Sequence, residues 1–236
     1  LDSETILAFA AALASSIFFV SAASWIDVTD MYIKNANYDN NSYEYWEGTA
    51  LSGANPMSNA EHYQKTFDTY QILVGLTPGK YRLSLKGYYR AGNSNADYSH
   101  FQNDGDNYKY AKLYARATLG EFSEPLVYCS SGVRYQSLGG ATSQVGGGYI
   151  PNNMEAAHYW FEAGYYDNSV ECNVGGDGTL RIGIKKTPTI NEDWTCIDSW
   201  KLEYYGDVVQ IASIVFPTNP LELIKGQQYQ MQPTIT

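Results

Sequence analysis

The sequence predicts an all-β protein whose main domain is an antiparallel β-sandwich or jelly roll. Between Trp25 and Gly206 apolar and polar residues alternate with a period of two, as they do in strands with one buried face. Gly, Asn and Pro residues interrupt this pattern at intervals that fit turns. Short antiparallel strands with one polar face are typical of sandwiches and jelly rolls.

The segment before the sandwich is apolar, and three interpretations of it stay open. Residues 6–23 carry no charge and are long enough to span a bilayer. A signal peptide fits the small residues that end at Ala22, although the acidic start lacks the usual basic region. A membrane anchor is the second interpretation. We favour the third, in which residues 1–24 form the helical tail of an upstream module, because Asp2 offers an N-cap and Ala and Leu favour helix.

Two hairpins are predicted inside the sandwich. The first joins residues 70–76 and 81–90 through a Pro-Gly turn, which fits type II because Pro presets φ and Gly accepts a positive φ. The second joins residues 169–174 and 179–186 through a Gly-rich turn.

Alternation assigns the side chains of these strands to two faces. The core face of residues 80–90 contains Tyr81, Leu83, Leu85 and Tyr89, and the opposite face contains Arg82, Ser84, Lys86, Tyr88 and Arg90. Residues 110–117 repeat the pattern, with Ala111, Leu113 and Ala115 on one side and Tyr110, Lys112, Tyr114 and Arg116 on the other. The closing strand, residues 194–206, is predicted to place Cys196, Trp200 and Leu202 on one side.

Two long stretches and the tail do not follow the strand pattern. Residues 91–107 and 130–153 are rich in Gly, Ser and Asn and are predicted to be long irregular loops. Such loops often carry binding residues, and they are equally common as plain surface connections. Residues 207–236 contain two short strands broken by prolines, too little for a complete sandwich, and are predicted to begin a second β module.

Composition and charge exclude several classes of protein. The chain has 236 residues with 25 Asp and Glu against 15 Lys and Arg, and its net charge of -10 excludes nucleic acid as the main partner. Hydrophobic residues make up 44%, which excludes an acidic disordered tail. Three cysteines without CxxC spacing predict no zinc site; one disulfide stays open, and Cys172 and Cys196 are expected to face inward. The 22 tyrosines favour half-exposed sheet faces and wet binding surfaces.

Five separated blocks of the sequence resemble a galactose-binding-domain-like jelly roll. They occur in the expected order at residues 26–48, 59–92, 110–115, 177–186 and 193–206. The similar domains belong to large modular secreted proteins of gut-type anaerobic Gram-negative bacteria. The tail resembles the opening strands of a group 2 bacterial Ig-like domain, whose pattern is matched by Ile211, Leu221, Leu223 and Gly226. The resemblance implies a jelly roll over residues 25–206 and the start of an Ig-like domain over residues 207–236.

The resemblance also implies a function. It implies a non-catalytic, carbohydrate-binding module of a secreted or cell-surface protein, whose partners are a poly- or oligosaccharide and the neighbouring domains of a longer chain. A structural or adhesive assembly module is the alternative, because the apolar helix and the incomplete Ig-like strands need a surface on which to dock. A glycoside hydrolase is the third hypothesis.

Aromatic and basic residues are the candidates for sugar binding, because aromatic rings stack on sugar CH groups and polar side chains bind hydroxyls. If the strands at residues 80–90 and 110–117 are neighbours, they form one aromatic–basic face that contains Tyr88, Arg90, Tyr110 and Tyr114. The alternative is a solvated sheet exterior. Loop aromatics are the second set, namely Tyr98, Tyr135, Trp160 and Trp194. For the two tryptophans the alternative is a core or lid position, and the resemblance implies that ligands often bind loops at one end of the sandwich.

A structural calcium ion near the first and last strands is a further implication of the resemblance. Asp39 and Asp198 occupy the matching places, and carboxylate oxygens suit Ca²⁺. Loops rich in Asn and Asp are also ordinary turns, so that interpretation stays open beside the calcium site. No cofactor is otherwise required.

Few residues fit a catalytic role. His62, His100 and His158 stand apart without a metal-binding spacing. A glycosidase pair would have to come from Glu61, Glu155, Glu162 and Asp193. For Glu61 a structural hydrogen bond is expected instead of acid catalysis. We therefore predict that the chain is not an enzyme.

Overall fold

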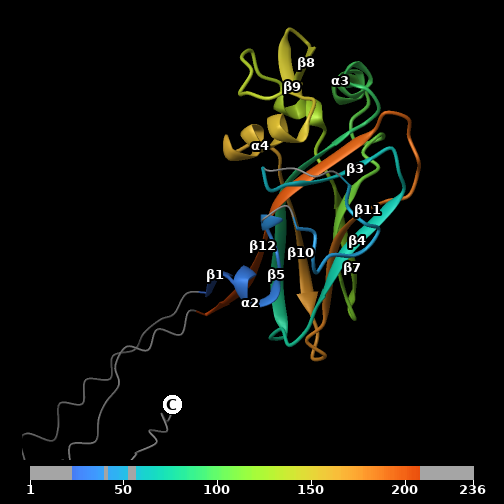
Figure 1. Ribbon diagram of the computed structural model, residues 1–236. Helices are drawn as coiled ribbons and strands as arrows, with labels where there is room; N and C mark the ends of the chain where they lie inside the picture. Colours follow the sequence, from blue (N-terminus) through green and yellow to red (C-terminus); the bar gives the residue numbers. More distant parts are fainter. Residues whose placement is uncertain (1–22, 40–41, 53–56, 208–236) are drawn as a thin grey trace, which may run out of the picture.

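The computed structural model describes residues 23–39, 42–52 and 57–207. It shows two antiparallel sheets packed face to face, with short helices and a small hairpin gathered at one end (Figure 1). The predicted all-β antiparallel sandwich is confirmed.

Two predicted end segments, the helix of residues 1–24 and the Ig-like start at residues 207–236, lie outside the described residues except at their inner ends. There, Ala23 begins the first strand and Asp207 ends the last, and the two residues are directly paired. The chain therefore enters and leaves the sandwich at neighbouring points (Figure 1).

Each of the two packed sheets has five strands within the described residues. Sheet A contains, in order, β1 (Ala23–Asp27), β12 (Trp194–Asp207), β5 (Gly79–Arg90) and β10 (Asp167–Val174), and β3 (Ala60–Tyr63) pairs with the first part of β12. Sheet B contains, in order, β2 (Glu47–Gly48), β4 (Phe67–Leu73), β11 (Leu180–Lys186), β6 (Lys112–Ala117) and β7 (Gly120–Pro125).

Both predicted hairpins are wrong, because the two strands of each belong to different sheets. β4 pairs within sheet B while β5 pairs within sheet A, and β10 and β11 are divided in the same way. The Pro-Gly and Gly-rich turns therefore carry the chain across the core. A strand with one apolar face buries it equally well beside a hairpin partner or opposite a second sheet, so alternation and turn residues do not distinguish the two.

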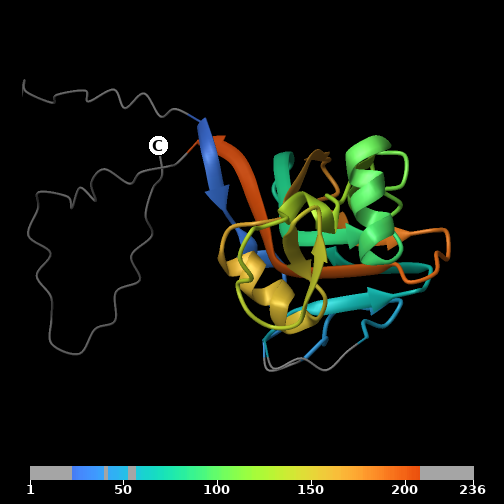
Figure 2. The same cartoon turned by 90° about the horizontal axis from the view of Figure 1, so that it is seen from above.

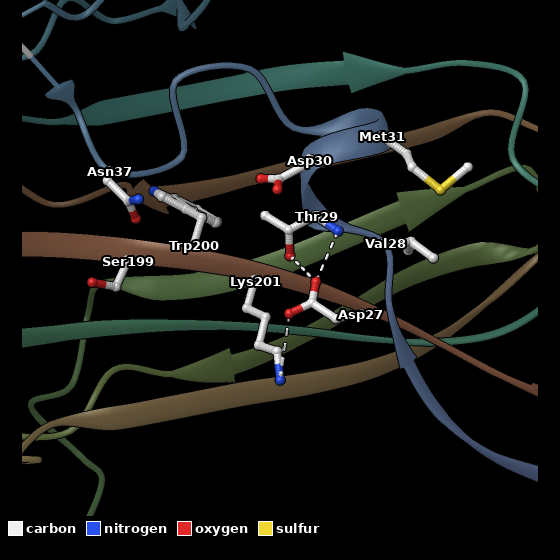
Figure 3. A pocket seen from close by; sticks show the side chains of 9 residues that line it. All are labelled: Asp27, Val28, Thr29, Asp30, Met31, Asn37, Ser199, Trp200 and Lys201. Atoms are coloured by element: carbon white, nitrogen blue, oxygen red, sulfur yellow. Dashed lines mark hydrogen bonds and ion pairs between the residues drawn. The ribbon is translucent and has the colours of Figure 1, made fainter.

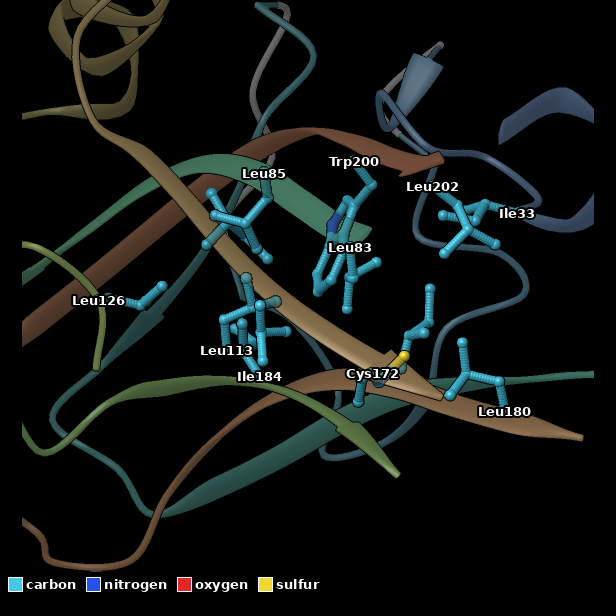
Figure 4. Close-up of a cluster of buried hydrophobic side chains, with 14 of the residues drawn as sticks. Ile33, Leu83, Leu85, Leu113, Leu126, Cys172, Leu180, Ile184, Trp200 and Leu202 are labelled. Atoms are coloured by element: carbon cyan, nitrogen blue, oxygen red, sulfur yellow. The ribbon is translucent and has the colours of Figure 1, made fainter. Parts of the chain in front are cut away.

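The apolar faces of the two sheets meet in the main core. In Figure 4, Leu83 and Leu85 of β5 point toward Leu113 of β6 and Ile184 of β11. The core faces predicted for residues 80–90 and 110–117 are confirmed, since Tyr81, Leu83, Leu85, Tyr89, Ala111, Leu113 and Ala115 are all buried. Burying one leucine or isoleucine side chain contributes about 1.5–3 kcal/mol, so this core is what holds the sheets together.

A β-bulge in β12 reverses the alternation that the sequence suggests. The register with β5 shifts between Asp198 and Lys201, and Ser199 has a φ of 52°. One extra residue moves every following side chain to the other face. Trp200 consequently enters the main core, whereas Cys196 is buried on the opposite face of sheet A. The predicted common side for these two residues is wrong.

The two stretches predicted as irregular loops contain regular structure. They include helix α3 (Ser94–Asn103), the 3₁₀ turn η2 (Cys129–Gly132) and a hairpin of β8 (Thr142–Val145) and β9 (Gly148–Pro151), which helix α4 (Met154–Glu162) follows. Figure 1 shows α3 and the β9–α4 unit at the same end of the sheets, and Figure 2 looks down on that end. The short helix α2 (Thr29–Tyr32) follows β1. No helix in the described part of the chain is long and apolar enough to cross a membrane.

The three cysteines are free and buried. Cys172 faces the main core, as predicted, and Cys129 and Cys196 belong to a second apolar cluster. Burial raises the pKa of the Cys196 thiol, which keeps it protonated. The three cysteines act as small hydrophobic side chains. None of them forms the one disulfide that the sequence analysis considered.

Candidate functional site

Three of the predicted sugar-binding residues lie in a second core, which forms where η2, β9 and α4 cover one end of the outer face of sheet A. Tyr88 and Trp160 are 0% exposed and Trp194 is 4% exposed. The Trp160 indole N–H donates to the Gly132 carbonyl oxygen at 2.8 Å. Because buried rings offer no face to a sugar, these three predictions are corrected. Trp160 and Trp194 occupy core positions, which was the alternative interpretation for them. Tyr88 is neither a sugar contact nor part of a solvated sheet exterior.

Arg90 holds loops of the same region together by hydrogen bonds. Its guanidinium donates to the Asn152 side chain at 2.7 Å and to the backbone carbonyls of Gly92 and Glu192 at 3.2 and 3.3 Å. It also lies 5.2 Å from the centroid of the Trp194 ring. Since the side chain is buried and each of its three guanidinium nitrogens donates a hydrogen bond within the protein, Arg90 positions loops and is corrected from a ligand contact to a structural residue.

Tyr114 is buried on the outer face of sheet B, beneath basic side chains. Its hydroxyl donates to Asp68 at 2.6 Å and accepts from the Arg181 guanidinium at 2.9 Å. Burial, followed by the hydrogen bond to Asp68, raises the pKa of Tyr114. Because β5 and β6 belong to different sheets, the single aromatic–basic face predicted for them does not exist.

The remaining predicted aromatics lie at the loop end of the sandwich. Tyr135 is 87% exposed, and Tyr98 and Tyr110 are partly exposed. Tyr98 packs against the second core, whereas Tyr110 follows α3 and its ring centroid lies 6.2 Å from that of Tyr108 and 6.3 Å from that of Tyr89. Tyr110 is therefore held in place by other rings while part of it faces outward.

A surface cleft opens beside Tyr110, at the end of sheet B where β6 begins and β7 and β11 end. Its volume is about 400 Å³, within the usual size of a small-ligand site. We call it the lysine cleft, and it is lined by Asp106, Lys109, Tyr110, Lys112, Pro125, Lys185, Lys186, Thr187 and Pro188.

The lysines of this cleft differ in how they are paired. Lys109 lies 2.6 Å from Asp106, and Lys185 pairs with Glu121. Lys186 is buried and pairs with Asp193, which also accepts a hydrogen bond from Tyr89 at 2.9 Å. Lys112 is exposed and has no ion pair among the described residues. The cleft therefore holds a fixed internal ion pair, two surface pairs and one free ammonium group.

A second pocket, which we call the bulge pocket, lies between α2 and the bulge of β12 (Figure 3). Its volume is about 480 Å³, and its lining includes Asp27, Thr29, Asp30, Ser199 and Lys201. The Thr29 hydroxyl and backbone N–H donate to Asp27 at 2.7 and 3.0 Å, which holds the pKa of that carboxyl below its ordinary value.

The bulge pocket is polar and offers no aromatic face. Trp200 is among its lining residues, but its side chain is buried and its indole N–H donates inward to the Tyr38 hydroxyl at 2.7 Å. The centroid of the Trp200 ring lies 4.6 Å from that of the Trp46 ring. A sugar in this pocket would meet hydrogen-bonding groups without a stacking surface.

The two predicted calcium ligands lie near the bulge. Asp198 is 5% exposed, accepts a hydrogen bond from the Ser199 backbone N–H at 2.6 Å and has no ion pair among the described residues. Its pKa is raised to about 7, mainly by burial and also by the carboxylates of Glu162 and Asp39, while the hydrogen bond from the Ser199 backbone lowers it. The described segments contain no group of three or more His, Cys, Asp or Glu placed to hold a metal ion. The described residues therefore include two candidate calcium ligands, Asp39 and Asp198, but not a complete set of ligands for the ion.

Two of the carboxylates considered for catalysis have structural partners. Glu61 accepts a hydrogen bond from the Trp194 indole at 2.6 Å, which confirms its predicted structural role. Asp193 is buried against Lys186. Neither is placed to act as a free acid or base.

Lys185 and Lys186 were absent from the sequence-based candidates. Lys112 was assigned to the polar face of its strand, but its proximity to Lys185 depends on the pairing of β6 with β11, which lie far apart in the chain. Two lysines at the end of one strand next to a Thr-Pro turn were the available signal. The signal was weak because lysines at strand ends are common on any surface.

Comparison with known proteins gives distant structural likeness alone. No family model and no curated protein matches the chain. Among solved structures it is similar to TmCBM61, a carbohydrate-binding module solved in complex with β-1,4-galactotriose, with 14% identity and a TM-score of 0.33 over 72% of this chain and 96% of that one. A likeness this distant identifies no family and says nothing about what this chain binds.

Proposed function

We propose that this chain is a non-catalytic glycan-binding module and that the lysine cleft is its binding site. The observation that carries the proposal is Tyr110, a partly exposed ring that lines a cleft beside lysine side chains able to donate hydrogen bonds. This combination suits a sugar, since one face of a pyranose ring is apolar and its rim carries hydroxyl groups.

The position of the cleft supports the same proposal. It lies at the end of a rigid sandwich, where β6, β7 and β11 and the segment after α3 meet. Contacts between Tyr110, Tyr89 and Tyr108 fix the ring before a ligand arrives, so little side-chain entropy is lost on binding. Tyr98 and Tyr135, at the same loop end, are proposed as contacts for a longer saccharide.

Exchange of Tyr110 tests the proposal. Tyr110→Leu keeps most of the apolar volume and removes the flat ring, so we expect affinity for a bound polysaccharide to fall about tenfold, equivalent to about 1.4 kcal/mol. The measurement is affinity gel electrophoresis against a panel of plant and host polysaccharides, with calcium present. Tyr205→Leu, an exposed tyrosine on the outer face of sheet A, is the matched control and should bind as the native chain does.

Two results would oppose the proposal. Absence of retardation by every polysaccharide in the panel would reject glycan binding. Equal retardation of Tyr110→Leu and Tyr205→Leu would reject the lysine cleft as the site and leave the function itself standing.

We also propose that a calcium ion binds near the bulge, with Asp39 and Asp198 among its ligands. The supporting observation is Asp198, a buried carboxyl whose pKa is raised by burial and by the charges of Glu162 and Asp39, so that a cation would neutralise a charge the fold otherwise has to bury. Calcium should then raise the Tm of the native chain and leave that of Asp198→Asn unchanged. An equal shift in both proteins would count against the site.

Secretion or display at the cell surface, as part of a longer chain, is the proposed setting. It rests on the sequence blocks that resemble modules of secreted proteins. Digestion of the full-length protein by protease added to intact cells tests this setting, and protection until the cells are lysed would refute it.

A further inference from the structure

The strand register at the lysine cleft places two like charges side by side. Lys112 of β6 and Lys185 of β11 are direct cross-strand partners, and the neighbour of Lys112 on its other side, in β7, is Pro125. Like charges directly opposite one another destabilise a sheet. Glu121 offsets Lys185, but no carboxylate of the described residues pairs with Lys112.

This local excess of positive charge contrasts with the rest of the chain. The protein has a net charge of -10, so its overall field repels anions. Asp106 is the acidic residue that lines the cleft, and it is already paired with Lys109. Lys186 is buried and neutralised by Asp193. The Lys185 ammonium pairs with Glu121 and lies 4.8 Å from the Tyr114 ring centroid. Among the described lining residues, the Lys112 ammonium is therefore the positive charge of the cleft that an anion could neutralise.

We propose that the lysine cleft takes a negatively charged saccharide, whose carboxylate or sulfate group binds the ammonium group of Lys112. The sugar ring that carries the charged group then lies toward Tyr110, which lines the same cleft. This inference rests on the proposed glycan-binding function and adds the chemical class of the glycan.

Pairs of polysaccharides that differ in charge alone test the inference. Polygalacturonate and its fully methyl-esterified form test a carboxylate, and dextran sulfate and dextran test a sulfate ester. Each is titrated into the full chain by isothermal calorimetry at low and at moderate NaCl concentration. We expect the charged member of one pair to bind about tenfold or more tightly than its neutral partner, because hydrogen bonds to charged groups are the stronger ones. We also expect its affinity to fall as salt rises.

Two variants locate the effect. Lys112→Glu should weaken binding of the charged polysaccharide about tenfold or more. The Tm of the variant should not fall, because the change removes one of two like charges on paired strands at an exposed position. Lys80→Glu makes the same change of charge at the start of β5 in the other sheet, and it should bind as the native chain does.

The outcomes separate this inference from the function on which it rests. Equal affinity for charged and neutral members, or equal affinity of Lys112→Glu and the native chain, would overturn the charged ligand while glycan binding stands. Failure of charged and neutral polysaccharides alike to bind would overturn both.

Discussion

Asp198 is enclosed by protein at the bulge of β12, and its titration follows from that enclosure. Its pKa is raised from 3.8 to about 7, first by burial and then by the nearby carboxylates of Glu162 and Asp39. Between these two values the folded chain holds a proton that the unfolded chain has released. The stability that this carboxyl contributes is therefore complete below pH 3.8 and is lost as the pH rises through 7.

Replacement of Asp198 by Asn imitates the protonated carboxyl at every pH. Without divalent cations, we expect Asp198→Asn to be more stable than the native chain at pH 8, by on the order of 2 kcal/mol, and nearly equal to it at pH 4. Urea unfolding at both pH values measures the difference. Glu44→Gln, at an exposed carboxylate, should show little change with pH. A stability difference for Asp198→Asn that stays constant from pH 4 to pH 8 would disagree with this explanation.

Aromatic residues show how far sequence reasoning reaches at the residue scale. Alternation placed Tyr81 and Tyr89 in the core correctly. It placed Tyr88 on the opposite face, also correctly, but that face is covered by α4 and its neighbours. Which part of a sheet is covered depends on contacts between residues about 70 positions apart, such as the ring contact between Tyr88 and Phe161 at 6.0 Å. Local pattern carries no information on such contacts.

At the scale of elements, the bulge of β12 decides which side chains reach the core. Ser199 has a φ of 52°, a left-handed conformation that glycine adopts readily and that β-branched residues adopt at a cost. Ser199→Gly should therefore be at least as stable as the native chain, and Ser199→Val should lose about 1–2 kcal/mol.

Chemical denaturation of these two variants, with Ser169 of the exposed edge strand β10 changed to Val as a control, measures the effect. Valine is favoured in a regular strand, so the control should be neutral or slightly stabilising. A Ser199→Val protein as stable as Ser199→Gly would show that the bulge conformation stores no strain.

The elements themselves were partly predictable from the sequence. The strands that alternate cleanly were found, whereas α3 and α4 were not, although each has a capping asparagine: Asn93 and Asn153 accept hydrogen bonds from the third backbone N–H of their helices. In α4 the buried residues Ala156, Ala157, Trp160 and Phe161 also follow a helical spacing. The Gly, Ser and Asn residues around these helices are typical of loops, so neither the asparagine caps nor the helical spacing was recognised. The partners of each strand were not predictable, because turn residues are the same in a hairpin and in a connection between sheets.

At the scale of the whole molecule, the two outer sheet faces are closed in different ways. One end of sheet A is covered by the second core, and the Tyr114 ring on sheet B is covered by basic side chains, with Lys185 4.8 Å and Arg116 5.6 Å from its centroid. An accessible combination of ring, donors and charge lies at the end of the sandwich, in the lysine cleft. Tyr110 could be predicted as a site residue from the sequence. That it lies near Lys185 could not, because this depends on the pairing of β6 with β11, which are distant in the chain.

Chemical-shift mapping tests binding at the lysine cleft most directly. Trigalacturonic acid is titrated into the ¹⁵N-labelled chain, and backbone amide shifts are followed by two-dimensional NMR. Glycan binding at the cleft predicts the largest shifts for Asp106 to Lys112 and for Lys185 to Thr187, and their loss in Lys112→Glu. Shifts gathered instead at Asp27 to Met31 and Ser199 to Lys201, around the bulge pocket, would contradict it.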